Sequence, residues 1–152
     1  MDHSFFGSVA LPDDADVVWE RPVEVSGGQL LLKLWADRRT DRQALDWLAE
    51  QAQRLDELHV EARGLLLAYL EDDRSFIDVH IEEAGLDLPS EVATFVDELP
   101  LRRVALWAVT FSEEEGDQVE VVMDFMVDPQ ASDEILAVKF QRDGEPYVAW
   151  ES

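Results

Sequence analysis

Residues 133–152 read "DEILAVKFQRDGEPYVAWES", and this stretch decides the fold. It places two strand-forming segments on either side of Asp143-Gly144, and an Asp-Gly pair between apolar runs is a strong short-range signal for a hairpin turn. We therefore predict that the second segment is the last strand of an antiparallel meander. Main-chain hydrogen bonds to the neighbouring strand would hold this strand in place, and Val148 and a buried Trp150 would lie on one of its faces.

The two segments upstream of this hairpin extend the same pattern. "VALWAVTF" (104–111) is apolar at nearly every position, which predicts a central strand that is covered on both faces. "QVEVVMDFMVD" (118–128) follows period two. It places Glu120, Asp124 and Asp128 on one face and five apolar residues on the other, namely Val119, Val121, Met123, Phe125 and Val127. Together with the hairpin, these segments predict a four-strand meander.

The first third of the chain predicts a second hairpin. "VVWERPVEV" (17–25) and "LLLKLWA" (30–36) alternate as half-buried strands do, and "SGGQ" between them supplies a turn. Pro22 cannot donate a hydrogen bond to a neighbouring strand, so the first of these strands is expected at a sheet edge. "SFFGSVAL" (4–11) is a weaker candidate for a third strand.

The middle of the chain changes to helical periodicity. Apolar residues recur at helical spacing across 41–71, which predicts one long helix or two in near-continuity, with Thr40 as a possible N-cap. Residues 89–99 predict a short helix with Ser90 as its cap. Residues 74–84 fit either a helix or a strand, and a helix is favoured because Gly85 follows "EEA".

This order of strands, helices and strands is typical of the α+β class. We predict a largely antiparallel sheet, built from the N-terminal hairpin and the C-terminal four-strand meander. The consecutive helices would pack on one face of it. The 152 residues suffice for one domain, 1–152, and are too few for two of ordinary size.

Composition limits the classes of function. Thirty-five Asp and Glu against 12 Lys and Arg give a formal net charge of -23, which repels nucleic acid and anionic membranes. A partner is therefore expected to be basic or apolar, although the acidity could also serve solubility alone. No cysteine is present, and neither a signal peptide nor a membrane helix is recognisable, so we expect a cytoplasmic protein.

Residues that could support catalysis are few. Of the three histidines, His3 is expected in a mobile terminus, His59 at the edge of a helical apolar stripe, and His80 as a surface or partly packed side chain. A metal site of Asp78, His80 and Glu83 can be drawn, but chance groupings are expected among 35 carboxylates. Nucleophile-elbow, phosphate-loop and calcium-loop motifs are absent. We expect no catalytic residue, no metal and no cofactor.

The negative charge is distributed unevenly. Residues 36–63 hold seven acidic and five basic groups, whereas 71–98 hold ten acidic and one basic, and 113–134 hold nine acidic and none basic. Such segments would form an acidic face if they lie close together, and such a face accelerates encounter with a basic partner. The candidate partner-facing acidic patch consists of Glu113, Glu114, Glu115, Asp117, Asp72 and Asp73.

The tail also carries a resemblance. "SDEILAVKFQRDG" (132–144) followed by a strand that closes on "WES" (150–152) resembles a family of small bacterial proteins known as a domain of unknown function. "FGSV" (6–9), followed by a strand that contains "VW", is similar to the same family. The resemblance implies a fold and a bacterial context, and no activity, because the matching residues form turns and strands.

These observations favour a binding protein over an enzyme. The leading hypothesis is an acidic protein-interaction module, either an immunity-type or a regulatory partner of a basic protein. The immunity role rests on analogy with other small acidic bacterial proteins. Two alternatives stay open: an enzyme that uses carboxylates in a cleft between sheet and helices, and a small-molecule sensor with an apolar pocket.

Overall fold

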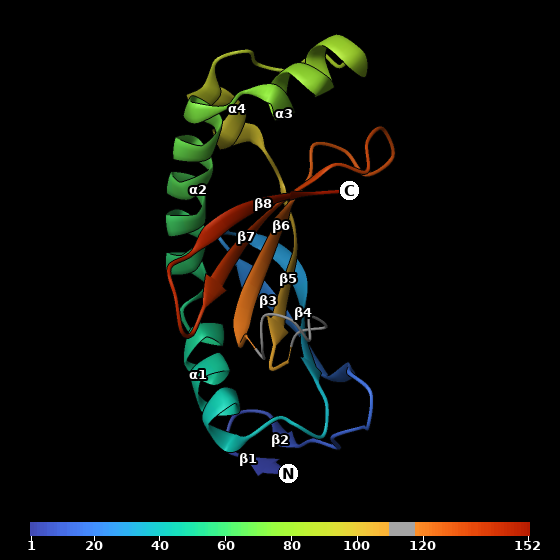
Figure 1. Cartoon of the computed structure of the whole chain (residues 1–152), viewed down its shortest axis with the longest axis vertical. Coiled ribbons are helices and arrows are strands. Elements are labelled where there is room, and N and C mark those ends of the chain that lie inside the picture. The colour runs from blue at the N-terminus through green and yellow to red at the C-terminus, as the bar shows by residue number, and fades with distance from the viewer. Residues whose placement is uncertain (110–117) are drawn as a thin grey trace.

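The computed structural model describes residues 1–109 and 118–152, which form an α+β fold. A six-stranded sheet in the order β3-β4-β5-β6-β7-β8 dominates it, and a separate two-stranded ribbon, β1-β2, lies near the N-terminus. Helices α1 and α2 run along one side of the sheet (Figure 1). The predicted fold class is therefore confirmed. No helix within the described residues is long and apolar enough to cross a membrane.

The N-terminal hairpin forms as predicted. Strands β3 (Asp16–Val25) and β4 (Gly28–Ala36) pair antiparallel, and β3 is an edge strand, as Pro22 requires. The weaker candidate at 4–11 does not join this sheet. Its only extended part is β2 (Gly7–Ser8), which pairs with β1 (Asp2–His3) in the small ribbon.

The C-terminal meander is also confirmed, and its four strands are joined by antiparallel pairing. They are β5 (Leu101–Trp107), β6 (Glu120–Phe125), β7 (Ile135–Gln141) and β8 (Tyr147–Glu151). The sheet has one parallel junction, where β5 lies beside β4. Parallel neighbours require a long crossover connection, and here the entire helical region supplies it.

Two helices occupy the region predicted as one or two. They are α1 (Arg42–Ala52) and α2 (Leu55–Asp72), with a break at 53–54. The acids Asp56 and Glu57 lie in the first turn of α2, where negative charge favours a helix start.

The predicted helix caps are wrong at two positions. Asp41 is the N-cap of α1, because its carboxylate accepts the backbone N–H of Ala44 at 2.8 Å. The hydroxyl of Thr40 instead accepts the N–H of Asp37 at 3.2 Å. In α4 (Val92–Glu98) the cap position falls one residue after Ser90 and has no side-chain hydrogen bond.

Residues 74–84 are helical, as favoured from the sequence. They form the short helix α3 (Ser75–Asp78) and then a π-helical turn, η1 (Val79–Glu83). Gly85 follows with a φ of +67°, a left-handed conformation that glycine adopts without strain. This helical end of the molecule lies beyond the last turn of α2 (Figure 1).

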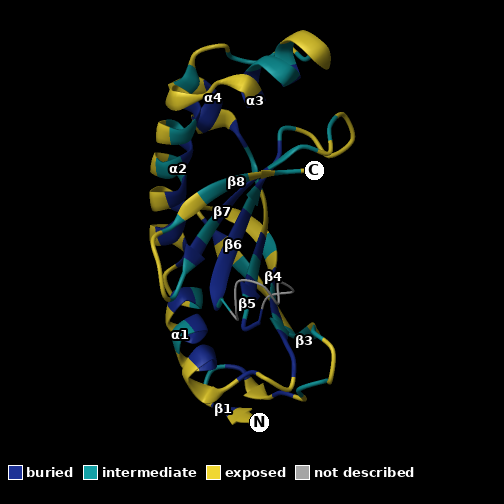
Figure 2. Ribbon diagram, viewed as in Figure 1, coloured by how far each residue is buried: buried dark blue, intermediate teal, exposed yellow. Residues whose placement is uncertain are grey.

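The core lies between the helices and one face of the sheet (Figure 2). Alternate residues of each strand point into it, so that Leu34, Leu106 and Met123 are fully buried. The residues between them on the same strands point to the opposite face, which carries no helix among the described elements. The prediction that β5 is covered on both faces is therefore wrong, since Ala105 and Trp107 are only partly buried.

Candidate functional site

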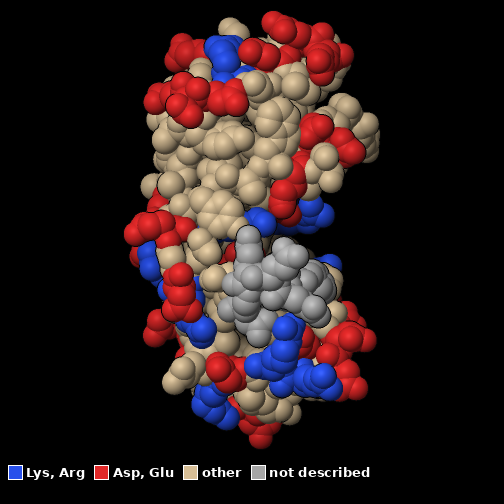
Figure 3. Space-filling view, viewed as in Figure 1, with Lys and Arg blue, Asp and Glu red and all other residues tan. Residues whose placement is uncertain are grey.

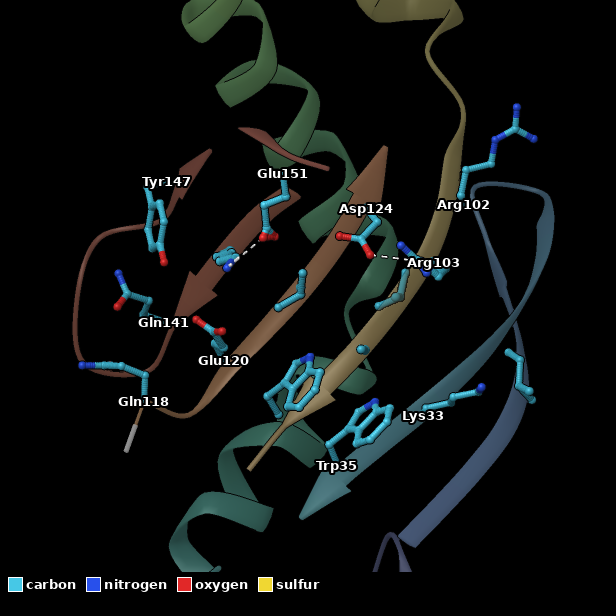
Figure 4. Close-up of a pocket in the computed structure, with 16 residues that line it drawn as sticks. Lys33, Trp35, Arg102, Arg103, Gln118, Glu120, Asp124, Gln141, Tyr147 and Glu151 are labelled. Carbon is cyan, nitrogen blue, oxygen red and sulfur yellow. Dashed lines mark hydrogen bonds and ion pairs between the residues drawn. The ribbon is translucent and has the colours of Figure 1, made fainter. Parts of the chain in front are cut away.

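The sheet face opposite the helices, here called the open face, contains a hollow of about 760 Å³ (Figure 4). It is lined by side chains from β4 to β8, because the pleat turns every second residue of these strands toward it. The lining side chains include Lys33, Trp35, Arg103, Trp107, Glu120, Val122, Asp124, Lys139, Tyr147 and Glu151.

Two stacked indole rings form an aromatic floor on the open face. Trp35 of β4 and Trp107 of β5 are direct neighbours across the parallel junction. Their ring centroids lie 4.8 Å apart, and the ring planes differ by 7°. The pair provides a flat apolar surface and stabilises the junction of the two halves of the sheet.

Two ion pairs cross the strands beside this floor. Arg103 Nε lies 3.1 Å from Asp124 Oδ2, and Lys139 Nζ lies 3.5 Å from Glu151 Oε2. Burial raises the pKa of Asp124, and the guanidinium of Arg103 opposes this effect.

The open face supports ligand binding better than catalysis. A catalytic acid can have a raised pKa, but the carboxylate of Asp124 is held by Arg103, its direct neighbour on the adjacent strand. Such an arrangement is typical of a structural ion pair. The hollow, the aromatic floor and the paired charges are the elements from which small-molecule sites are built.

His3 is buried, so the prediction of a mobile terminus is wrong. Its Nδ1 accepts the backbone N–H groups of Phe5 and Phe6 at 3.1 and 3.4 Å. Nε2 therefore carries the proton and donates to Asp46 at 2.8 Å. This histidine ties the N-terminal ribbon to α1 and has no free nitrogen for chemistry.

His80 is fully buried, so the surface or partly packed position predicted for it is also wrong. Nδ1–H donates to the carbonyl of Phe76 at 2.7 Å, and Nε2 accepts the Ser132 hydroxyl at 2.9 Å. Both nitrogens are therefore used, and His80 joins η1 to the loop before β7. Within the described part of the chain, no group of three His, Asp or Glu residues could hold a metal ion. This applies also to the site considered from the sequence, which consists of Asp78, His80 and Glu83.

His59 is likewise more buried than its predicted edge position. Its Nδ1 lies 2.7 Å from the hydroxyl of Ser26, and Nε2 is a buried atom without a hydrogen-bond partner. Ser26 has a φ of +50° in the tight turn between β3 and β4, and its N–H donates to Asp56. The tip of the hairpin is thus fastened to the first turns of α2.

The burial of His59 predicts an acid-sensitive contribution to stability. Two effects lower the pKa of His59 in the folded protein: the larger is desolvation by burial, and the smaller is the nearby positive charge of Arg63. In the unfolded chain the pKa of His59 is about 6.5, so the unfolded chain binds the proton more readily than the folded protein. The contribution of neutral His59 to stability is therefore fully present above about pH 6.5 and is lost as the pH falls below it. We expect His59→Gln to show a smaller loss of stability than the parent between pH 7.5 and 5. Urea melts across this range measure the difference, and equal pH dependence in both proteins would contradict it.

The predicted acidic patch is described only in part. Glu113, Glu114, Glu115 and Asp117 lie outside the described residues, so their placement stays a prediction. Asp72 and Asp73 are exposed where α2 ends. Asp73 accepts hydrogen bonds from the backbone N–H and hydroxyl of Ser75 at 3.0 and 2.6 Å.

These two residues belong to a larger acidic surface that the structure brings together, here called the acidic end (71–98). It comprises the last turn of α2, α3, η1, α4 and the segments that join them, and it holds ten carboxylates against Arg74 alone. Nine of the ten are exposed, and red side chains crowd this end of the molecule in Figure 3. The ten are Glu71, Asp72, Asp73, Asp78, Glu82, Glu83, Asp87, Glu91, Asp97 and Glu98.

Neither a known protein family, nor a curated protein, nor a solved structure matches this chain. The resemblance of its tail to a bacterial family therefore stays a prediction. What can be inferred about function rests on the geometry and charge described above.

Proposed function

We propose that this chain is a non-catalytic interaction module whose acidic end binds the basic surface of a protein partner. The observation that carries the proposal is the gathering of ten carboxylates against one arginine in the acidic end, on its helical elements and on the segments that join them. An immunity-type or regulatory role in the bacterial cytoplasm is the biological setting that we propose for it.

The single arginine does little to offset this charge. Its Nε lies 3.1 Å from Asp78, and its Nη2 donates to the carbonyl of Ser90 at 3.0 Å. An exposed pair of this kind contributes little energy, and the other nine carboxylates remain. Their summed field would steer a basic partner toward this end and raise the association rate, an effect that salt screens beyond about 8 Å at physiological ionic strength.

Neutralising part of the acidic end is expected to slow association severalfold at low salt. The variant carries Glu82→Gln, Glu83→Gln and Asp87→Asn, all at exposed positions, so the fold is expected to stay intact. The partner is first isolated by co-purification, and association and dissociation rates are then measured over a salt series. The dissociation rate is expected to change little, because long-range charge acts mainly on the encounter.

A matched control separates this effect from net charge alone. Asp14→Asn, Glu50→Gln and Glu61→Gln change the net charge equally but at exposed positions outside the acidic end. The control is expected to associate nearly as fast as the parent. The proposal would be contradicted if the association rate did not depend on salt, or if it fell equally in both variants. The acidic residues would then serve only the solubility of the protein.

A further inference from the structure

The two edges of the main sheet are built differently. Edge strand β3 is guarded against further pairing, because Pro22 lacks an N–H and the register shifts between Val17 and Trp19. Edge strand β8 has neither device, since it contains no proline and pairs with β7 without a shift in register. Natural proteins usually protect such an edge, so an unguarded one indicates a strand that can pair with another chain.

The side chains of β8 point to the same conclusion. Tyr147 and Trp150 are 42% and 36% exposed, and they are two of the five large apolar side chains that are exposed among the described residues. They point to opposite faces of the strand. Aromatic side chains of this kind are enriched at the energetic centres of protein interfaces.

The edge is continuous with the acidic end. Trp150 packs edge-on against Phe76 of α3, with ring centroids 5.4 Å apart, and its indole N–H donates to the carboxylate of Glu134. Figure 3 shows a largely uncharged surface over α2 and β8, bordered by the carboxylates of the acidic end. An apolar centre with a charged rim is the usual anatomy of a protein interface.

We propose that β8 accepts an extended basic segment of a protein partner, which adds a seventh strand to the sheet. Main-chain hydrogen bonds would supply affinity, and alternate side chains would supply selectivity. On the paired strand, apolar residues of the partner would continue the side of Trp150, and basic residues would face Glu151 on the opposite side. Basic residues that flank the paired strand would meet Glu134 and the acidic end, which lie on the side of Trp150. A second copy of this chain fits poorly, because each copy carries a net charge of -23. This inference rests on the proposed function and specifies the docking element.

Hydrogen exchange with a defined peptide tests the inference. The probe is a capped heptapeptide of alternating Lys and Val, and its matched control has Pro in place of the central Val, which removes one donor and the strand conformation. The heptapeptide is expected to slow amide exchange in Tyr147–Glu151 at least tenfold and to leave β3 unchanged. The proline peptide is expected to give no protection.

Two variants provide the matched control on the protein. Ala149→Lys places a cation at the middle of β8 and is expected to weaken peptide binding at least fivefold. Val17→Lys makes the same change in charge on β3 and is expected to bind like the parent. Thermal melts of both variants establish that they fold, and the exchange measurement on the unmodified chain does not depend on either.

The remaining outcomes separate this inference from the proposed function. Salt-dependent binding without protection of β8, or equal binding of both peptides, would overturn strand addition and leave the acidic end as the binding surface. Protection of β8 that is insensitive to salt and to the acidic-end variant would contradict the proposed function alone. A dimer in sedimentation that protects β8 would assign the edge to a second copy, and absence of binding at millimolar peptide would overturn strand addition.

Discussion

Deletion of residues 146–152 is expected to abolish the cooperative unfolding transition. It removes β8, which pairs with β7 over five residues. It also exposes the edge of β7, in which Leu136, Ala137 and Val138 are fully buried. An apolar strand exposed in this way loses its packing and becomes a site of aggregation. Circular dichroism and tryptophan fluorescence, followed in urea, are expected to show a broad or absent transition.

The sequence predicts two causes for this effect, the loss of a paired strand and the loss of a buried Trp150, and the structure confirms the pairing. Trp150 was expected to be buried, and this is wrong, since the structure leaves about a third of it exposed. The last strand therefore contributes to stability chiefly by pairing with the edge of β7. Deletion of Ser152 alone, an exposed residue outside β8, is the control and is expected to leave the transition unchanged. A truncated protein that melts like the parent would refute the role assigned to the last strand.

Phe76→Ala is expected to destabilise the protein by about 3–5 kcal/mol, the usual cost of removing a fully buried phenylalanine. The ring of Phe76 contacts His80, Phe95 and Trp150, with centroids 4.5, 6.1 and 5.4 Å away. It thus joins α3, η1, α4 and β8. Because domains of this size are stable by only about 5–15 kcal/mol, this loss is a large fraction of the total.

Equilibrium unfolding in urea measures this change. Val60→Ala on α2 is the matched control, because Val60 is 73% exposed and its truncation is expected to change the free energy of unfolding by less than about 0.5 kcal/mol. If Phe76→Ala cost as little as the control, the packing between the acidic end and β8 would be looser than the structure indicates.

Most of the fold could be predicted from the sequence, because local signals specify it. The turns at 26–27 and 143–144 identified both hairpins, and periodicity identified the helices. The parallel junction could not be predicted in this way, since periodicity tells which face a residue occupies and not which strand lies beside it. Trp35 and Trp107 could be placed on strands, but nothing local indicates that they stack.

The candidate site was predictable only in part, for the same physical reason. The excess of acidic residues in 71–98 follows from counting residues in the sequence. Only the structure shows that these residues lie together at one end of the molecule. The histidines were misplaced because their partners are remote: Asp46 lies 43 residues from His3, and Ser132 lies 52 residues from His80. These remote partners satisfy both ring nitrogens of His3 and His80, together with nearby backbone groups, as is usual for buried polar groups, and no local sequence pattern indicates them.

The parallel junction between β4 and β5 also has a consequence for the order of events in folding. Its contacts join Leu32 to Val104, positions 72 residues apart (104 − 32), whereas both hairpins close over short loops. Pairings of such long range form slowly, because the chain between them must first be confined. During synthesis, the N-terminal hairpin and the helices would leave the ribosome before β5 exists. The edge of β4 therefore has no partner strand until β5 has been synthesised, and an unpaired apolar edge can pair with another chain.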